Sequence, residues 1–135
     1  MKTTVKRLRM LIELYPRLAI AGGPKSGKTT LALAIGDGRR ILHGDSWMGE
    51  DWSETSRLIA GAANCLDEPF IVEGVQVPRA LRKGMKADAV IWLDRPHQQL
   101  TPGQESMAKG CKTVLREWQI DKPFTPVIYF EETPE

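Results

Sequence analysis

The sequence predicts an α/β protein, a three-layer α/β/α arrangement in which helices cover both faces of a parallel sheet of about five strands. Short apolar segments alternate with helical segments along the chain, which is the pattern of a parallel sheet with right-handed crossovers. The chain has 135 residues, enough for one such domain over residues 1–135 and too few for a second. A glycine-rich run, residues 22–29, stands between the first apolar segment and the helix after it.

The predicted elements begin with a helix that docks on the domain. Apolar residues recur there at helical spacing with charges between them, which predicts a helix over about residues 3–15. Residues 17–21 are an apolar run typical of a strand buried on both faces. Residues 29–35 favour a helix, and the glycines at positions 36 and 38 end it.

Further strands and helices alternate along the rest of the chain. The strands are expected at residues 40–43, 70–72, 87–93 and 126–130. One helix is expected from a capping box at Asp51 to about Asn64, and a short one between Pro78 and Gly84. The longest helix opens with a capping box at Thr101 and runs to about Trp118. Trp92 and Trp118 are expected in the core.

Composition and charge narrow the kinds of partner. The formal net charge of +2 is nearly balanced and gives no support for nonspecific nucleic-acid binding, so we expect no nucleic-acid partner. No stretch approaches the roughly 20 apolar residues that cross a bilayer, so we expect a cytoplasmic protein without a membrane partner. Cys65 and Cys111 lack metal-ligand spacing and are expected to be reduced core thiols. The sequence leaves the oligomeric state open, including a dimer formed through the N-terminal helix.

The glycine-rich run matches the pattern GxxxxGK[ST], which is typical of loops that bind nucleotide phosphates. Glycines let the backbone curl so that amide groups point at a phosphate, and the helix that begins here adds the positive end of its dipole. Lys28 is placed to reach the β- and γ-phosphates, Thr29 offers a hydroxyl to Mg²⁺, and Thr30 is a second small polar group near the α-phosphate. The predicted nucleotide-binding residues are Gly22, Gly23, Pro24, Lys25, Ser26, Gly27, Lys28, Thr29 and Thr30.

Charged residues follow the other predicted strands. Asp45 comes after the second strand, Glu73 after the third, and Asp94 and Arg95 after the fourth. Ligands of such a sheet bind beyond the carboxyl ends of its strands, so these residues and the glycine-rich run are expected to converge on one crevice.

With its motifs in this order, most of the chain resembles the small P-loop kinases, a class that includes nucleoside and nucleoside-monophosphate kinases. The resemblance rests on the glycine-rich run, His43-Gly44-Asp45-Ser46, Ile71-Val72-Glu73-Gly74 and Leu93-Asp94-Arg95-Pro96. It implies a P-loop NTPase fold with strand order 2-3-1-4-5. It also implies Mg²⁺-dependent transfer of the γ-phosphoryl group of ATP to a nucleoside, nucleotide or similar hydroxyl or phosphate acceptor. Compact proteins of this kind are frequent in bacteriophage genomes.

The resemblance also implies catalytic and metal-binding roles. Asp45 would orient or deprotonate the acceptor, while Lys28 and Arg95 would stabilise the transferred phosphoryl group. Arg95 lies at the base of a lid-like segment over about residues 95–103.

Glu73 and Asp94 compete for the place beside the metal ion that Thr29 would bind. The resemblance favours Glu73, acting through a water molecule, because the third strand would lie beside the loop-bearing strand and the fourth on its other side.

The residues expected to contact the acceptor are Asp45, Trp47, Arg79 and Arg82. Arg79 and Arg82 are three positions apart on the short helix and share a face that suits an anionic group. Trp47 and Trp52 follow Asp45 and are candidates for stacking on a base or sugar, although packing against the sheet is an equal alternative for Trp52. Nucleoside-monophosphate kinases normally have a longer acceptor domain that is richer in arginine, which leaves a phosphate-bearing acceptor in doubt.

Lys109, Lys112 and Arg116 project from the longest predicted helix. Any of them can contribute a cation to the transferred phosphate, but for Lys112 and Arg116 we favour a solvated basic face.

A second functional interpretation is a non-kinase P-loop NTPase or a nucleotide-gated interaction module. Nucleotide binding would then alter partner binding, and no acceptor pocket would be needed. A GTPase is not expected, because the guanine-reading pattern [NT]KxD is absent and Asp121-Lys122 lacks the residues that should precede it.

Overall fold

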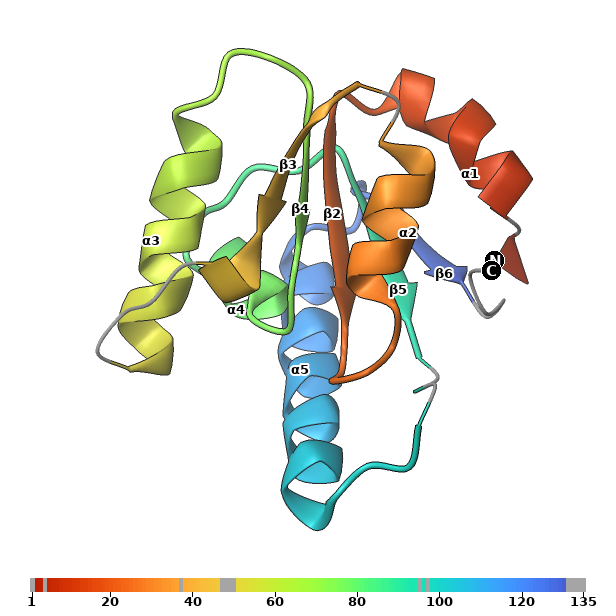
Figure 1. Cartoon of the computed structure of the whole chain (residues 1–135). Coiled ribbons are helices and arrows are strands. Elements are labelled where there is room, and N and C mark those ends of the chain that lie inside the picture. The colour runs from red at the N-terminus through yellow and green to blue at the C-terminus, as the bar shows by residue number, and fades with distance from the viewer. Residues whose placement is uncertain are drawn as a thin grey trace.

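A parallel sheet of six strands forms the centre of the structure (Figure 1), a computed structural model that describes residues 2–3, 5–36, 38–46, 51–94, 96 and 98–130. The strands lie in the order β1-β6-β5-β2-β4-β3, and every pair is parallel. They are β1 (Lys2–Thr3), β2 (Arg17–Gly22), β3 (Arg40–His43), β4 (Phe70–Glu73), β5 (Ala89–Leu93) and β6 (Val127–Phe130). The five longer strands therefore have the predicted order 2-3-1-4-5, which is confirmed, and the two-residue β1 adds an edge that was not expected.

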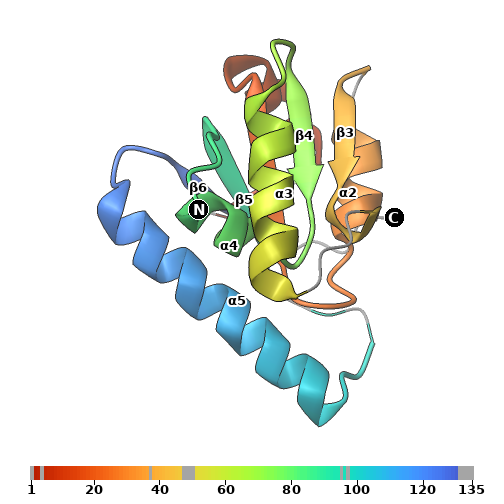
Figure 2. The same ribbon diagram turned by 90° about the vertical axis from the view of Figure 1, so that its left-hand side faces the viewer.

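Helices cover both faces of this sheet. α1 (Val5–Leu11) and α2 (Lys28–Ile35) lie on one face, and α3 (Trp52–Asn64), α4 (Val77–Arg82) and α5 (Pro102–Asp121) lie on the other, in front of the sheet in Figure 2. The helix expected over about residues 3–15 divides into β1, α1 and a 3-10 turn, η1 (Ile12–Leu14). No helix within the described part of the chain is long and apolar enough to cross a membrane.

Two hydrophobic cores, one on each face of the sheet, give the fold its three layers. Alternate residues of β2 point in opposite directions, so that Leu18 and Ile20 pack with α1 and α2 while Ala19 and Ala21 pack with the other three helices. Trp92 and Trp118 are buried in the second core, as predicted. The predicted three-layer α/β/α arrangement is therefore confirmed.

Side-chain caps fix where two of the helices begin. The Asp51 side chain accepts a hydrogen bond of 2.8 Å from the Glu54 backbone at the start of α3. Thr101 and Gln104 form a reciprocal capping box at the start of α5, with bonds of 3.2 and 3.0 Å. Both caps were predicted from their sequence spacing, because a capping residue must stand three positions before the amide that it binds.

The prediction that both cysteines are core thiols is half wrong. Cys111 is fully buried on α5, but Cys65 is exposed. Cys65 directly follows the last residue of α3 and accordingly leaves the face that this helix buries.

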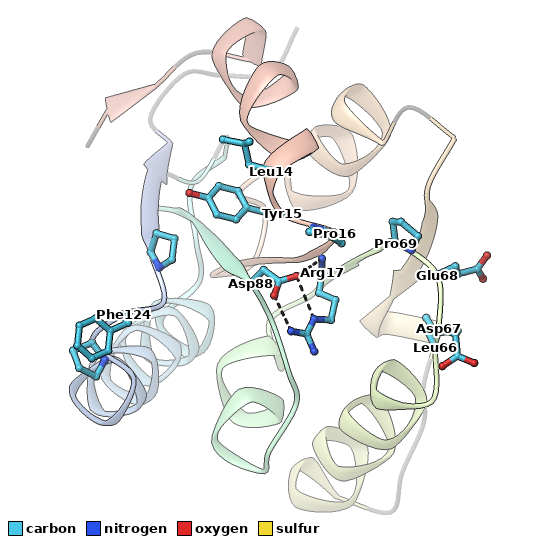
Figure 3. Close-up of a pocket in the computed structure, with 12 residues that line it drawn as sticks. Leu14, Tyr15, Pro16, Arg17, Leu66, Asp67, Glu68, Pro69, Asp88 and Phe124 are labelled. Atoms are coloured by element: carbon cyan, nitrogen blue, oxygen red, sulfur yellow. Dashed lines mark hydrogen bonds and ion pairs between the residues drawn. The ribbon is translucent and has the colours of Figure 1, made fainter.

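An ion pair joins the amino-terminal ends of two neighbouring strands (Figure 3). Asp88 Oδ2 accepts hydrogen bonds from the backbone nitrogen and Nε of Arg17, at 2.8 and 3.2 Å, and Oδ1 accepts one of 2.8 Å from Nη2. The hydrogen bonds from Arg17 lower the pKa of Asp88, against the opposing effect of partial burial.

Replacement of Asp88 by asparagine is expected to reduce the free energy of unfolding at pH 7 by about 1–2 kcal/mol, because charge-assisted bonds are lost from a partly exposed site. A carboxyl group whose pKa is lowered by folding stabilises the protein above its unfolded pKa. It loses this effect as the pH falls through the folded value. Urea unfolding of both proteins at pH 7 and at several values below about pH 4 should therefore show the difference closing. A difference that stayed constant with pH would rule out the ion pair as its source.

Candidate functional site

The carboxyl ends of four strands meet at one edge of the sheet. Because the strands are parallel and in register, Glu73 at the end of β4 is paired with Ile20 on β2 and with His43 at the end of β3. On the other side of β2, Gly22 is paired with Leu93 at the end of β5. The segments that follow these strands therefore surround the residues 22–29, called the glycine loop below.

The glycine loop turns tightly into α2. Gly27 has a φ of 87° at the position before the helix, a left-handed conformation that glycine adopts without strain. Lys25 has a φ of 59° and is the one non-glycine residue with a positive φ within the described ranges. Backbone conformations of this kind in non-glycine residues are costly and concentrate at binding sites.

Lys28 folds back onto the loop from the first turn of α2. Its Nζ donates to the Gly23 carbonyl at 2.6 Å and lies 3.4 Å from Ser26 Oγ, which itself donates to Gly23 at 2.8 Å. Lys28 is only 9% exposed, and burial lowers the pKa of its ammonium group. The negative charges of Glu73 and Asp45 act in the opposite direction. The loop therefore contains a cation within its curve, flanked by two acids.

Glu73 links three segments at the mouth of the loop. Its side chain is buried, and Oε2 accepts a 2.8 Å hydrogen bond from Thr29 Oγ1. The same oxygen lies 2.7 Å from Nδ1 of His43, and because a carboxylate oxygen only accepts, Nδ1 is the donor. Of the two acids considered for a place beside Thr29, the structure brings Glu73 and not Asp94 to that hydroxyl.

Asp45 lies in a 3-10 turn, η2 (Gly44–Ser46), directly after β3. Its side chain is exposed and close enough to Lys28 for its charge to act on the pKa of that residue. The turn packs tightly on the end of β4, since a Cβ atom at Gly44 would lie 2.9 Å from the Glu73 carbonyl oxygen. Asp45 is therefore held at the same edge as Lys28 and Glu73.

Arg79 and Trp52 form a stacked pair beside this edge. The Arg79 guanidinium lies 4.7 Å from the centre of the Trp52 ring, and its Nη1 lies 3.7 Å from Cys111 Sγ. Arg79 has no carboxylate partner within the residues that the structure describes. Trp52 therefore packs against an arginine and lies outside the two cores of the sheet. Arg82 is exposed at the end of α4 and has no hydrogen bond or ion pair within the same residues.

Asp94 belongs to a second cluster on the other side of the glycine loop. It accepts hydrogen bonds from Trp92 Nε1 at 3.1 Å and Lys112 Nζ at 3.3 Å, and these partners, chiefly Trp92, lower the pKa of Asp94. Asp94, Lys109 and Lys112 line a cavity of about 200 Å³ whose opposite wall is the glycine loop. Lys112, for which the sequence favoured a solvated basic face, is 35% exposed and forms an ion pair with Asp94 beside the loop.

Two of the predicted site residues, Trp47 and Arg95, lie outside the described residues. The same holds for part of the lid-like segment, of which residues 96 and 98–101 precede α5.

Gly23 is the point at which the glycine loop touches α5. A Cβ atom at Gly23 would lie 2.6 Å from Ala108 Cβ and 3.1 Å from Ala108 Cα, too close for both the glycine loop and α5 to remain in place. Gly61 on α3, in contrast, would place a Cβ atom in open space.

Replacement of Gly23 by alanine is expected to lower the free energy of unfolding by about 1–3 kcal/mol through overpacking. The matched change of Gly61 to alanine should raise it by about 0.5–1 kcal/mol, because alanine favours the helix. Urea unfolding of the two variants measures both values. Equal stability of the two variants would mean that the loop and α5 separate readily.

A larger cavity lies at the opposite edge of the sheet, around the Arg17–Asp88 pair (Figure 3). It has a volume of about 1050 Å³, and its walls include Tyr15, Asp67 and Phe124. No residue of the glycine loop lines it. The site residues predicted at the carboxyl ends of the strands are thus separated from this cavity by the length of the sheet.

The oxygen ligands at the glycine loop suit a metal ion that takes most of its ligands from water and substrate. No group of three or more His, Cys, Asp or Glu side chains suited to hold a metal occurs within the described ranges of the chain. Mg²⁺ typically binds one or two protein oxygens together with water and substrate phosphates, and Thr29 with Glu73 would suit that role.

No protein-family model matches the chain, and no curated protein matches its sequence.

Proposed function

We propose that the protein is a Mg²⁺-dependent kinase that transfers the γ-phosphoryl group of ATP to a small acceptor, most simply a nucleoside or nucleotide. The observation that carries the proposal is the contact between Thr29 and the buried Glu73 at the mouth of a loop that contains Lys28. Thr29 Oγ1 donates a hydrogen bond to Glu73 Oε2, which leaves the lone pairs of the hydroxyl oxygen available to a metal ion. The glycine loop, Lys28 and Glu73 would together bind a nucleoside triphosphate and its metal ion.

The glycine loop would hold the phosphates. Its backbone amides and the N-terminus of α2 suit an anion, and Lys28 would exchange the Gly23 carbonyl for the β- and γ-phosphate oxygens. Mg²⁺ bound there would neutralise phosphate charge and orient the γ-phosphoryl group. Thr29 and Glu73 would hold the ion, Glu73 through a water molecule.

Asp45 supplies the carboxylate on the acceptor side, where it acts as a general base. With an alcohol as acceptor, the hydroxyl oxygen forms a bond to the γ-phosphorus while the bond from that phosphorus to the β–γ bridging oxygen breaks. Asp45 accepts the hydroxyl proton, and ADP leaves with the electron pair of the broken bond. Trp47, Arg79 and Arg82 remain proposed acceptor contacts. Arg79 has no carboxylate partner among the described residues, so its charge suits an anionic group of the acceptor.

Two lysines of α5 would contribute positive charge on the opposite side of the glycine loop. Lys109 and Lys112 face the glycine loop across the small cavity and would place positive charge near the γ-phosphate, together with Arg95.

The test is acceptor-dependent turnover. Purified protein is incubated with Mg²⁺ and ATP and with a panel of nucleosides, nucleotides and sugars, and products are identified by mass spectrometry. ATP consumption should be slow alone and faster with the right acceptor, whose mass should rise by one phosphoryl group. ATP hydrolysis that no acceptor accelerates would instead support the non-kinase NTPase. Absence of any phosphorylated product would overturn the kinase proposal.

A further inference from the structure

A histidine outside the phosphate-binding pattern contacts the acid that we assign to the metal. His43 is the last residue of β3, and the parallel register pairs it with Glu73 on β4. Its Nδ1 lies 2.7 Å from Glu73 Oε2, the oxygen that also accepts from Thr29. We propose that His43 is a positioning residue for the metal site and fixes the Glu73 carboxylate in the orientation that Mg²⁺-nucleotide binding requires. The inference rests on the proposed function.

Burial gives this contact its importance. Glu73 is 1% exposed, and a buried carboxylate is costly unless hydrogen bonds replace the water that it has lost. The two donors that the described residues provide are the Thr29 hydroxyl and His43 Nδ1. The Thr29 hydroxyl rotates freely about its C–O bond and would also serve the metal, whereas the histidine ring sits on a strand. His43 is therefore the more rigid of the two supports.

Both donors converge on one oxygen, and this sets the direction of the other. With Oε2 occupied twice, Oε1 has no hydrogen-bond partner within the described part of the chain. It is free to accept from a metal-bound water. Loss of the bond from Nδ1 would let the carboxylate rotate and exchange its oxygens, so that the metal site would have to be ordered at the time of binding.

His43 can act in this way without touching nucleotide or metal. Its side chain is 37% exposed on the edge strand of the sheet, and its known polar contact is with Glu73. Partners that orient metal ligands typically contribute about 10- to 100-fold to metal affinity. We therefore expect the role of His43 to appear in the metal dependence of nucleotide binding.

The experiment compares two substitutions that differ in the hydrogen-bond donor. His43→Phe keeps a ring of similar size but removes the donor, whereas His43→Asn places an amide nitrogen near the position of Nδ1. Binding of a non-hydrolysable ATP analogue is followed by calorimetry as the Mg²⁺ concentration is varied, and once with a chelator present. Arg40→Gln, on the same strand but paired with the exposed Glu68, is the control. Circular dichroism verifies that each variant is folded.

His43→Phe is expected to raise the Mg²⁺ concentration for half-maximal binding about ten-fold. His43→Asn and Arg40→Gln should stay near the original value, and binding in the presence of chelator should be the same in all. Equal Mg²⁺ dependence of His43→Phe and the unchanged protein would overturn the inference and leave the proposed function standing, as would equal effects of His43→Phe and His43→Asn. Failure of the unchanged protein to bind the analogue with Mg²⁺ would overturn the proposed function and the inference together.

Discussion

Replacement of Lys28 by methionine is expected to weaken the binding of ATP analogues at least about 100-fold, since each charge-assisted hydrogen bond to a phosphate contributes about 1.5–3 kcal/mol. Lys28 is the cation that the structure places within the curve of the glycine loop. Methionine keeps most of the side-chain volume and removes the charge. Calorimetric titration with a non-hydrolysable ATP analogue measures the loss of affinity.

The same substitution should leave the domain folded. Burial lowers the pKa of Lys28, which means that the folded state disfavours its charge relative to the unfolded state. The lysine therefore reduces stability at pH values below its lowered pKa, and this cost is relieved as the pH rises through that value. Lys28→Met should unfold in urea at the same or a higher concentration than the unchanged protein.

Lys122→Met, the same change at an exposed position after α5, is the control for charge alone. Nucleotide affinity of Lys28→Met equal to that of this control would contradict phosphate binding by the glycine loop.

Replacement of Asp45 by asparagine is expected to reduce turnover with the right acceptor about 10²- to 10⁴-fold, the usual range for a general base. Asparagine is similar in size but cannot accept the hydroxyl proton. Affinity for ATP should be unchanged or slightly higher, because a negative charge that acts on Lys28 is removed. Steady-state kinetics and nucleotide binding measure the two effects separately.

Asp67→Asn provides the matched control, because it makes the same change at an exposed position at the far edge of the sheet. It should affect neither quantity. Full turnover of Asp45→Asn would remove Asp45 from the chemistry and favour a nucleotide-gated interaction module.

The fold could be predicted because its signals are local. An apolar run reports a buried strand, and a capping residue reports a helix start, as at Asp51 and Thr101. The edge strand β1 could not be predicted, since two residues are too few to carry a pattern. The N-terminal helix was expected as one element for a related reason: helical spacing does not distinguish α1 from the tighter turn η1.

The candidate site was predictable only to the level of strand ends. The rule that ligands bind beyond those ends brought Asp45 and Glu73 to the glycine loop, where the structure places them. Contacts between side chains of different strands depend on register, which the sequence does not give. Counting back from the strand ends would have paired His43 with Glu73, but that requires knowledge that β3 and β4 are neighbours.

Other contacts depend on tertiary packing alone. The ion pair of Lys112 with Asp94 forms because α5 crosses beside the end of β5, and no spacing rule connects residues 18 positions apart in this way. The stacking of Arg79 on Trp52 likewise joins two helices. The resemblance to small P-loop kinases implied a lid and an acceptor pocket. The structure places the Lys112–Asp94 pair beside the start of the lid-like segment, and the Arg79–Trp52 pair brings together two residues considered for the acceptor pocket.

The central position of β2 has a thermodynamic consequence. This strand lies between β4 and β5, so the glycine loop at its end has its shape only when the middle of the sheet is assembled. A ligand of the loop therefore binds the folded state alone, and it stabilises the whole domain by about 2.7 kcal/mol at a concentration of 100 Kd. The melting temperature of the protein should therefore rise in the presence of any compound that binds the loop. Thermal shifts can thus rank candidate nucleotides and acceptors before any reaction has been observed.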